Sequence, residues 1–438
     1  MPCAVGAVAF GARGCKVSVV AGLTQYAQGY FWLFAGFALH MSYLTLFYRR
    51  KGFDDFQIGA LEAIGSLCMV VSALYWGPLA DRVSHRGRLV AALALGLSLS
   101  FPLLWVLPAN PWLVLPVVVI FYLCRSPLVP LLDTLFLEDL HQRGDSQAVH
   151  YGRTRSWGSV GFIVAATLVP LIMAPEETSD PLQRLLPVFV AFTVFGLLLA
   201  ARAATMRPPP SMSEPETATP PAAARGRAQL REVFALRGYK RLLVILLVSW
   251  VANQCYYLFL SLYLDEIQVA DKLKGLYWSV GVLAEISMLA AGPWLMGRCS
   301  LRALMLWGLA GRALRLLALS FPLPPAIVFW AVMPLHSLGF AAVHLATMGY
   351  LARLVPPRLR ATGQTVNAGL VAGLGGMLGS LMAGALSKLT TAPAAGGTGL
   401  SFLGLHGIFA AFGAATLLQI AITLVAWRTL RDSPRPDA

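Results

Sequence analysis

The chain has 438 residues, of which 57% are hydrophobic and only 12% are charged. The charged share is about half that of a soluble domain, which excludes a disordered protein, a coiled coil and an ordinary soluble enzyme. The apolar runs are continuous rather than alternating, which excludes an outer-membrane barrel. A helical integral membrane protein remains, because one spanning helix needs about 20 apolar residues.

The first segment, residues 1–23, is rich in Ala, Val and Gly but is interrupted by Arg13 and Lys16. It has no basic region ahead of a compact apolar core, so we expect a cytoplasmic tail and no cleaved signal peptide. Twelve apolar spans follow, at residues 24–47, 55–77, 88–108, 111–137, 154–174, 184–203, 241–264, 275–297, 302–321, 325–353, 363–388 and 400–427.

Residues 204–240 separate the spans into two sets of six. The part at 204–230 is rich in Pro, Ala, Ser and Thr and cannot form a core, and we expect a short interfacial helix at 231–240. The sequence therefore predicts an N-terminal bundle at 24–203, a cytoplasmic linker at 204–240, a C-terminal bundle at 241–428 and a cytoplasmic tail at 429–438. Gly-Pro pairs near the ends of spans 2 and 8 indicate a parallel repeat of the kind found in transporters.

The loops set the orientation of these spans. Arginine and lysine gather after the even-numbered spans, so the positive-inside rule places both termini in the cytoplasm of a multi-pass inner-membrane protein. The net charge of +14 is explained by these loops, and we expect no nucleic-acid partner. One basic cluster, at residues 49–51, lies in an odd loop, and acidic stretches lie in the odd loops at 176–180 and 265–271.

Other classes of site are not expected. The six cysteines are scattered without metal-ligand spacing, so we predict neither a disulfide framework nor a metal site, and no cofactor. The sequence also lacks a nucleophile elbow, a zinc-spaced His pair and an acyltransferase motif, which argues against a membrane enzyme.

Ionisable residues inside the spans are the main functional candidates. Each costs roughly 2.5–3.5 kcal/mol on the insertion scale, so each needs a partner, a watery cavity or a function. They are His40, Glu62, Arg125, Asp133, Arg155, Glu285, Arg312, Arg315, His336, His344 and Lys388. For His40 and Glu62, packing or interfacial solvation is an equally good explanation. Glu285 shares one helix face with Trp278 and Gly281, as expected of a packed interior with a polar opening.

Several motifs resemble known transporters. Residues 77–82, GPLADR, with Arg86 and Arg88 resemble the loop 2–3 signature of the major facilitator superfamily. The runs YGRTRSWGSVGF (151–162), GVLAE (281–285) and LHSLGF (335–340) resemble helices 5, 8 and 10 of the lactose permease, nucleoside symporter and phenylpropionate permease group, most closely the last branch. The resemblance implies an all-α polytopic fold with twelve transmembrane helices in two six-helix bundles, the major facilitator fold.

The resemblance also implies roles for individual residues. Asp133 and Arg155 fall at the substrate-contacting pair of helices 4 and 5, and Glu285 falls at the helix 8 acid that links substrate and proton sites. Arg315 and His336 fall at the helix 9 arginine and the helix 10 histidine. A static ion pair is the structural alternative for Glu285 and for Asp133–Arg155.

One position departs from the lactose permease pattern. Gly339 stands where that protein has a second essential acid, so the proton-carrier role does not transfer there. We therefore expect Glu285 to be the coupling carboxylate, with Arg315 and His336 as its neighbours and Asp133 as the next candidate.

Three sets of candidate residues result. Proton coupling is assigned to Glu285, Arg315, His336 and Asp133. Substrate binding is assigned to Asp133, Arg155, Glu285, Arg125, Asn253, Tyr257, Trp278 and His40. A cytoplasmic gate is assigned to Gly77, Asp81, Arg82 and Arg86. The aromatic residues can equally serve as core.

The predicted function is secondary active transport by alternating access, coupled to protons, for uptake of a small organic solute. An aromatic or other organic acid fits best, because Arg125, Arg155 and Arg315 suit a carboxylate; nucleosides or sugars come next. Export of a secondary metabolite or siderophore is the alternative, although span 5 lacks the Gly-Pro signature of the exporting branch. A solute sensor without turnover also remains. We expect a monomer whose partners are the substrate, protons and membrane lipid.

Overall fold

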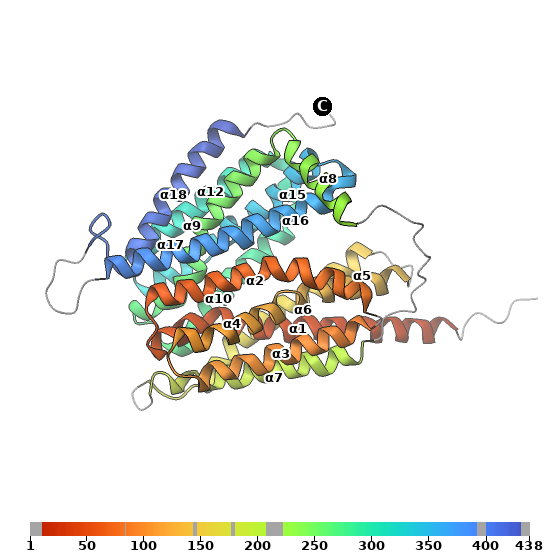
Figure 1. Cartoon of the computed structure of the whole chain (residues 1–438), viewed down its shortest axis with the longest axis horizontal. Helices are drawn as coiled ribbons and strands as arrows, with labels where there is room; N and C mark the ends of the chain where they lie inside the picture. The colour runs from red at the N-terminus through yellow and green to blue at the C-terminus, as the bar shows by residue number, and fades with distance from the viewer. Residues whose placement is uncertain are drawn as a thin grey trace, which may run out of the picture.

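The chain folds into two groups of helices that meet along one long contact. The computed structural model describes residues 11–83, 85–142, 147–176, 180–206, 222–391 and 400–430. Over these residues the secondary structure is helical, apart from an isolated bridge between Phe402 and Leu405. In Figure 1, α1, α3, α4, α6 and α7 lie in the lower part of the view and α9, α12, α17 and α18 in the upper part, with α2 and α10 between them.

The N-terminal half contains six spans. Its helices are α1 (Gly11–Lys51), α2 (Asp55–Arg82), α3 (Arg86–Val106), α4 (Pro111–Arg125), α5 (Leu128–Gln142), α6 (Gln147–Leu168) and α7 (Leu186–Ala204), with short 3₁₀ turns η1 (Val169–Ile172) and η2 (Gln183–Leu185). Local sequence explains several ends. Asp54 and Gln57 form a reciprocal capping box at the start of α2, and Asn110 caps α4 ahead of Pro111. Helices α4 and α5 together form the fourth span.

The C-terminal half also contains six spans, several of them interrupted. Its elements are α8 (Ala222–Ala235), α9 (Tyr239–Glu266), α10 (Asp271–Ala290), α11 (Gly292–Arg298), α12 (Leu301–Leu319), α13 (Pro325–Ile327), η3 (Val328–Val332), α14 (Leu335–Ser337), η4 (Leu338–Ala342), α15 (Val343–Leu354), η5 (Pro357–Leu359), α16 (Arg360–Asn367), η6 (Ala368–Leu374), α17 (Gly375–Thr390) and α18 (Gly407–Thr429). The segments η3, η4 and η6 are π-helical, a form that often marks functional sites.

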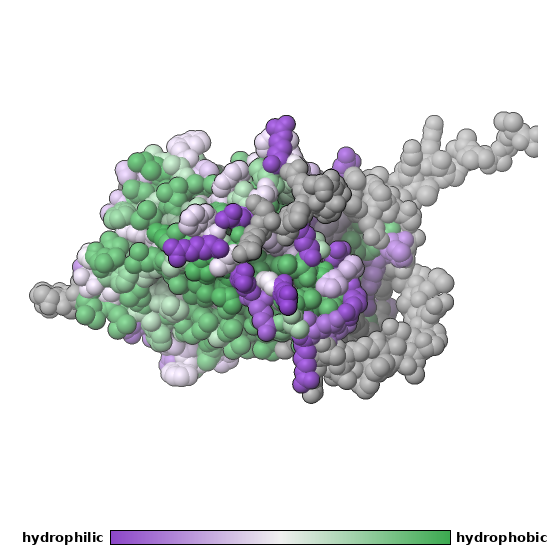
Figure 2. Space-filling view, turned by 90° about the horizontal axis from the view of Figure 1, so that it is seen from above, coloured by the Kyte–Doolittle hydropathy of each residue, from purple (hydrophilic) through white to green (hydrophobic). Residues whose placement is uncertain are grey.

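The expected twelve-helix fold is confirmed. Ten helices are long and apolar enough to cross a membrane, and the pair Pro325–Val332 and Leu335–Leu354, bent by 42°, adds one more. The remaining span is α12, which carries Arg302, Arg312 and Arg315 over 19 residues and packs against α15 and α18. Figure 2 shows a largely hydrophobic surface, with hydrophilic side chains gathered toward one end.

Three expected boundaries differ from the structure. Helix α1 begins at Gly11, so the expected tail at 1–23 has no structural break at residue 23. The helix before span 7 occupies 222–235 instead of 231–240, and Gly238, with φ of 86°, separates it from α9. The last helix begins at Gly407 and not at 400, because Leu403, Gly404 and Gly407 adopt positive φ angles. Of the expected linker, residues 207–221 lie outside the described residues, as do residues 431–438 of the expected C-terminal tail.

We name the two ends of the molecule by their loops. The linker side carries α8, and the far side carries residues 52–54 and 267–270. Glycine allows the backbones of the two halves to approach closely: a Cβ on Gly59 would lie 2.5 Å from the Ser380 carbonyl oxygen, and one on Gly275 would lie 2.0 Å from that of Ala166. These contacts join α2 to α17 and α6 to α10.

Candidate functional site

A continuous polar chain crosses the interior of the C-terminal half. Glu285 Oε2 on α10 lies 3.3 Å from His336 Nε2 on α14. The other ring nitrogen, His336 Nδ1, lies 2.7 Å from Arg315 Nη1 on α12, and Arg315 Nη2 donates to Asn253 Oδ1 on α9 at 2.6 Å. A guanidinium can only donate, so Nδ1 must accept and the ring proton must lie on Nε2, facing the Glu285 carboxylate.

Of the two neighbours expected for Glu285, His336 contacts it directly, and Arg315 reaches it only through His336. His336 stands between Glu285 and Arg315, because α14 packs against both α10 and α12. Arg315 is also held over the Tyr256 ring, at 3.7 Å from its centroid, and is 1% exposed. Three of the four expected coupling residues are therefore brought together, with the histidine connecting the acid to the arginine, whereas Asp133 lies in the N-terminal half.

Other polar groups of this half also make hydrogen bonds, although Arg315 Nε has no partner within the described residues. Arg312 Nη1 donates to Ser249 at 2.8 Å and its Nε donates to the Gly339 carbonyl. Trp278 Nε1 donates to Ser261 at 3.1 Å, and the Trp278 ring stacks on Tyr257. Trp278 is thus a buried core residue, which limits the substrate role that we predicted for it.

In the N-terminal half, Asp133 and Arg155 form one of two separate polar groups. Asp133 Oδ1 lies 3.8 Å from Arg155 Nε and accepts a hydrogen bond from the Tyr30 hydroxyl at 2.5 Å. The Arg155 guanidinium packs over the Phe34 ring at 4.3 Å. The helix 4–helix 5 pair expected from the resemblance is therefore present.

The second group lies farther along α1 and centres on Tyr122 of α4. The Tyr122 hydroxyl donates to Glu62 Oε2 at 2.7 Å and lies 3.2 Å from His40 Nε2. Arg125, one turn after Tyr122, stacks over the Phe37 ring at 4.2 Å. Glu62, His40, Tyr122 and Arg125 are called the Arg125 cluster below.

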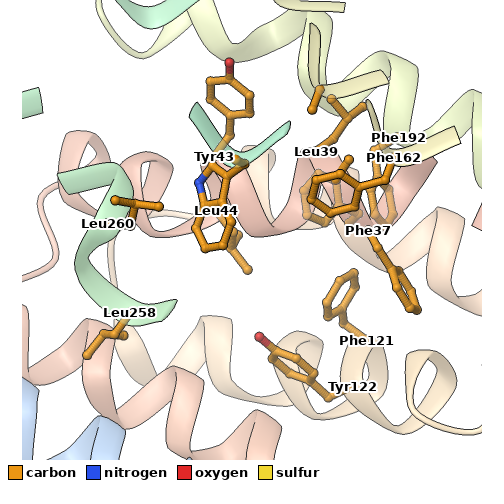
Figure 3. Close-up of a cluster of buried hydrophobic side chains, with 14 of the residues drawn as sticks. Phe37, Leu39, Tyr43, Leu44, Phe121, Tyr122, Phe162, Phe192, Leu258 and Leu260 are labelled. Carbon is orange, nitrogen blue, oxygen red and sulfur yellow. The ribbon is translucent and has the colours of Figure 1, made fainter. Parts of the chain in front are cut away.

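A cavity of about 240 Å³ lies between the halves and reaches this cluster. All four members of the Arg125 cluster line it from one side, and Trp250, Gln254, Tyr257 and Leu258 line it from the other. In Figure 3, Leu44 and Tyr122 of the N-terminal half lie opposite Leu258 of the C-terminal half, with Phe37 and Phe121 nearby. Neither Asp133 nor Arg155 belongs to the lining of this cavity.

Three members of the Arg125 cluster have buried polar atoms beside the cavity without hydrogen-bond partners in the described structure. Within the described residues, Arg125 makes no hydrogen bond or ion pair, and its Nε is buried without a partner. Glu62 Oε1 and His40 Nδ1 are likewise buried without partners there. Buried polar groups are nearly always hydrogen-bonded in folded proteins, so a cavity lined by three such residues is a candidate ligand site.

The far side holds an ion-pair network that the sequence analysis did not predict. Asp271 of α10 accepts from Arg50 at 2.6 and 2.8 Å and from Lys274 at 2.6 Å, and it lies 3.3 Å from Arg184. Asp265 accepts from both Arg50 and Lys274. Since Arg50 and Arg184 belong to the N-terminal half, this far-side network closes that side of the molecule.

On the linker side, the described residues form no comparable ion-pair network between the halves. In the described part of the chain, every ion pair that joins the halves lies on the far side. Of the predicted gate residues, Arg86 pairs with Glu138 inside its own half and donates from Nε to the Ala80 carbonyl at 3.0 Å. Gly77, Asp81 and Arg82 lie in α2. The structure describes their backbone as helical but not their side chains or contacts.

Two signals in the sequence pointed to features that the predictions missed. The basic cluster at 49–51 was the exception to the loop-charge rule, and it pairs with the acidic stretch at 265–271. Glu62 is an acid inside a span, and its own helix has no cation close enough to pair with it. Its hydrogen-bond donor, Tyr122, comes from α4. Both partners are supplied by tertiary contacts.

Comparison with known proteins agrees with this geometry. A family model described as the MFS_1 like family matches residues 23–394. The chain belongs to this family of the major facilitator superfamily. It is thus a multi-pass membrane transporter of the major facilitator type, with a membrane position consistent with its apolar helices.

Individual relatives differ in what their names say they carry. The chain is 29% identical to the probable 3-phenylpropionic acid transporter of Escherichia coli K12, covering 74% of this chain and 81% of the relative. It is 27% identical to the maltose permease of Geobacillus stearothermophilus, covering 85% and 89%. The structure of the nucleoside transporter NupG matches with a TM-score of 0.77 at 14% identity, covering 94% of this chain and 100% of that one, which shows the shared fold.

Proposed function

We propose that this family member takes up a small organic acid together with protons, across the inner membrane and with both termini in the cytoplasm. The observation that carries the proposal is Arg125, a guanidinium in a membrane span that lines the central cavity without a hydrogen bond or ion pair among the described residues. Arginine stays protonated in proteins, and its fork of donors matches a carboxylate. A substrate carboxylate would supply the missing partner.

The rest of the cavity suits a small aromatic acid. Its volume is slightly below the range that holds drug-sized ligands. Tyr257 and Trp250 provide aromatic surface opposite Arg125, and Leu44 and Leu258 are apolar. The similarity to a probable 3-phenylpropionic acid transporter favours the same chemical class.

Glu285 is the coupling carboxylate in this proposal. Its carboxylate faces the His336 N–H, and His336 is held in turn by Arg315. A proton that neutralises Glu285 weakens its attraction to His336. Loosening this contact changes the packing of α10, which contacts α1 and α9, two helices that line the cavity. Asp133 is the second candidate for a proton site. It accepts a hydrogen bond from Tyr30 and lies beside Arg155.

The far-side network stabilises one of the two states of the transport cycle, the state in which the far side is closed. With the positive-inside orientation, the linker side is cytoplasmic and the structure is closed toward the outside. Opening the far side would break the contacts between Arg50 and Asp271, and Asp81 of the loop 2–3 signature would then help close the cytoplasmic side.

Purified protein in proteoliposomes tests the proposal. A pH gradient, acidic outside, should drive accumulation of radiolabelled 3-phenylpropionate above its equilibrium level, and an internal pH dye should report co-entry of protons. Maltose and uridine serve as sugar and nucleoside probes. Uphill accumulation of either, with none of the acid, would contradict the proposed substrate class; acid movement only out of an acidified lumen would favour the exporter alternative.

A further inference from the structure

The Arg125 cluster contains a carboxylate whose role the transport proposal leaves open. Glu62 is held by the Tyr122 hydroxyl at 2.7 Å through Oε2, while Oε1 is buried without a partner in the described structure. Glu62 lines the same side of the cavity as Arg125, and the carboxylate and the guanidinium attract each other. We propose that Glu62 takes up a proton when an organic anion binds Arg125, so that anion and proton enter the cavity as a neutral pair. This inference rests on the proposed function.

Charge balance is the first argument. In the empty cavity Arg125 is positive and Glu62, when ionised, is negative, so the cluster is neutral. An anion bound at Arg125 leaves one uncompensated negative charge in a cavity between membrane-spanning helices. Such a charge is costly, and the group that can remove it is the nearby carboxylate, by taking a proton.

The groups around Glu62 support this assignment. The ionisable side chains near it are His40 and Tyr48 on α1, Tyr122 and Arg125 on α4, and Tyr257 across the cavity. Arg125 is the only cation in this set that is always charged. Helix α17, which packs along α2, places its lysine, Lys388, at the far side, where it pairs with Asp54 at 2.8 Å.

The hydrogen-bond directions leave room for the added proton. The Tyr122 hydroxyl has one hydrogen and donates it in the hydrogen bond to Glu62. The contact with His40 therefore requires His40 Nε2 to donate to the Tyr122 oxygen. Both bonds survive when a proton is added to Glu62 Oε1, because that atom has no partner to lose among the described residues. The proton comes from the solution on the side from which the anion enters and leaves with it on the other side.

Equilibrium binding of 3-phenylpropionate to the detergent-purified full chain tests the inference. Above the pH at which the probe is fully ionised, the affinity of the unaltered protein should fall by about tenfold per pH unit over the range where a proton is taken up on binding. In weakly buffered solution, mixing protein with probe should consume close to one proton per anion bound. Glu62→Gln carries the neutral form permanently, so it should bind with the low-pH affinity at every pH and consume no proton.

The matched control is Glu232→Gln, the same change at a carboxylate on α8 that pairs with Arg358 outside the spans. It should keep the pH slope and the proton uptake of the unaltered protein. A Glu62→Gln protein that binds with an unaltered slope and still consumes a proton would overturn the inference while leaving the transport proposal standing. Absence of 3-phenylpropionate binding to the unaltered protein would overturn both. If Glu62→Gln does not fold, lack of proton uptake by the unaltered protein overturns the inference by itself.

Discussion

The two halves hold their buried charges in different ways. In the C-terminal half, Arg312 and Arg315 each donate hydrogen bonds to neighbouring groups, and His336 and Glu285 complete the chain. In the N-terminal half, Arg125 faces the central cavity without such a partner in the described residues. The hydrogen bonds of Arg315 fix its position even though its Nε has no partner, whereas Arg125 has all its donors left for a ligand in the described structure. On this basis we place the coupling carboxylate Glu285 in the first half, and the anion site, with the proton that Glu62 takes up beside it, in the second half.

The largest effect is expected from removing the acid of the C-terminal chain. Glu285→Gln cannot exchange a proton, so uphill accumulation of 3-phenylpropionate in proteoliposomes should be abolished. Exchange of labelled for unlabelled substrate, which needs no net proton movement, should persist. Uphill accumulation at the normal rate in this variant would show that the proton travels elsewhere, with Asp133 the next residue to change.

The far-side network should control which state is populated. Asp271 is 2% exposed and accepts from Arg50 and Lys274, and losing one partner of a buried ion pair costs about 3–5 kcal/mol. Asp265 compensates part of this, so Asp271→Asn should raise the population open on the far side by tenfold or more. The measurement is the labelling rate, from that side, of a cysteine at Ser126 in the cavity, in a background without native cysteines.

Asp54→Asn is the matched control for this experiment. Its ion pair with Lys388 also joins the halves on the far side, but the two side chains are 37% and 53% exposed. Exposed pairs contribute only about 0–1 kcal/mol, so the labelling rate should change by less than fivefold. Equal effects of the two substitutions would mean that the network around Asp271 is not the lock.

A smaller effect, on stability, is expected at the position where the lactose permease pattern has a second acid. A Cβ on Gly339 would lie 2.9 Å from Arg312 Cγ, so Gly339→Ala must displace a buried arginine. Overpacking of this kind costs about 1–3 kcal/mol and should lower the melting temperature by a few degrees. Gly281→Ala, whose Cβ would be 3.4 Å from His336, is the control and should melt close to the unaltered protein. A melting temperature for Gly339→Ala no lower than that of the control would show that the site tolerates a side chain.

The fold could be predicted from the sequence because each span is a local property of about 20 apolar residues. The bent pair around Pro334 and the arginine-bearing α12 were still found as continuous apolar runs. The site could be predicted only in part. The buried charges were identifiable one by one, yet their partners depend on helix packing: His336 separates Glu285 from Arg315, and Tyr122 holds Glu62. The role expected for Trp278 as a ligand could not be judged without seeing Ser261 beside it.

The central claim is that Arg125 binds the substrate carboxylate, and it is tested most directly by comparing 3-phenylpropionate with its neutral amide. A charge-assisted hydrogen bond contributes about 1.5–3 kcal/mol, so the unaltered protein should prefer the acid by tenfold or more. Arg125→Gln should lose this preference, whereas Arg155→Gln, whose guanidinium lies outside the cavity lining, should keep it. An Arg125→Gln protein that still prefers the acid as strongly as the unaltered one would contradict the account.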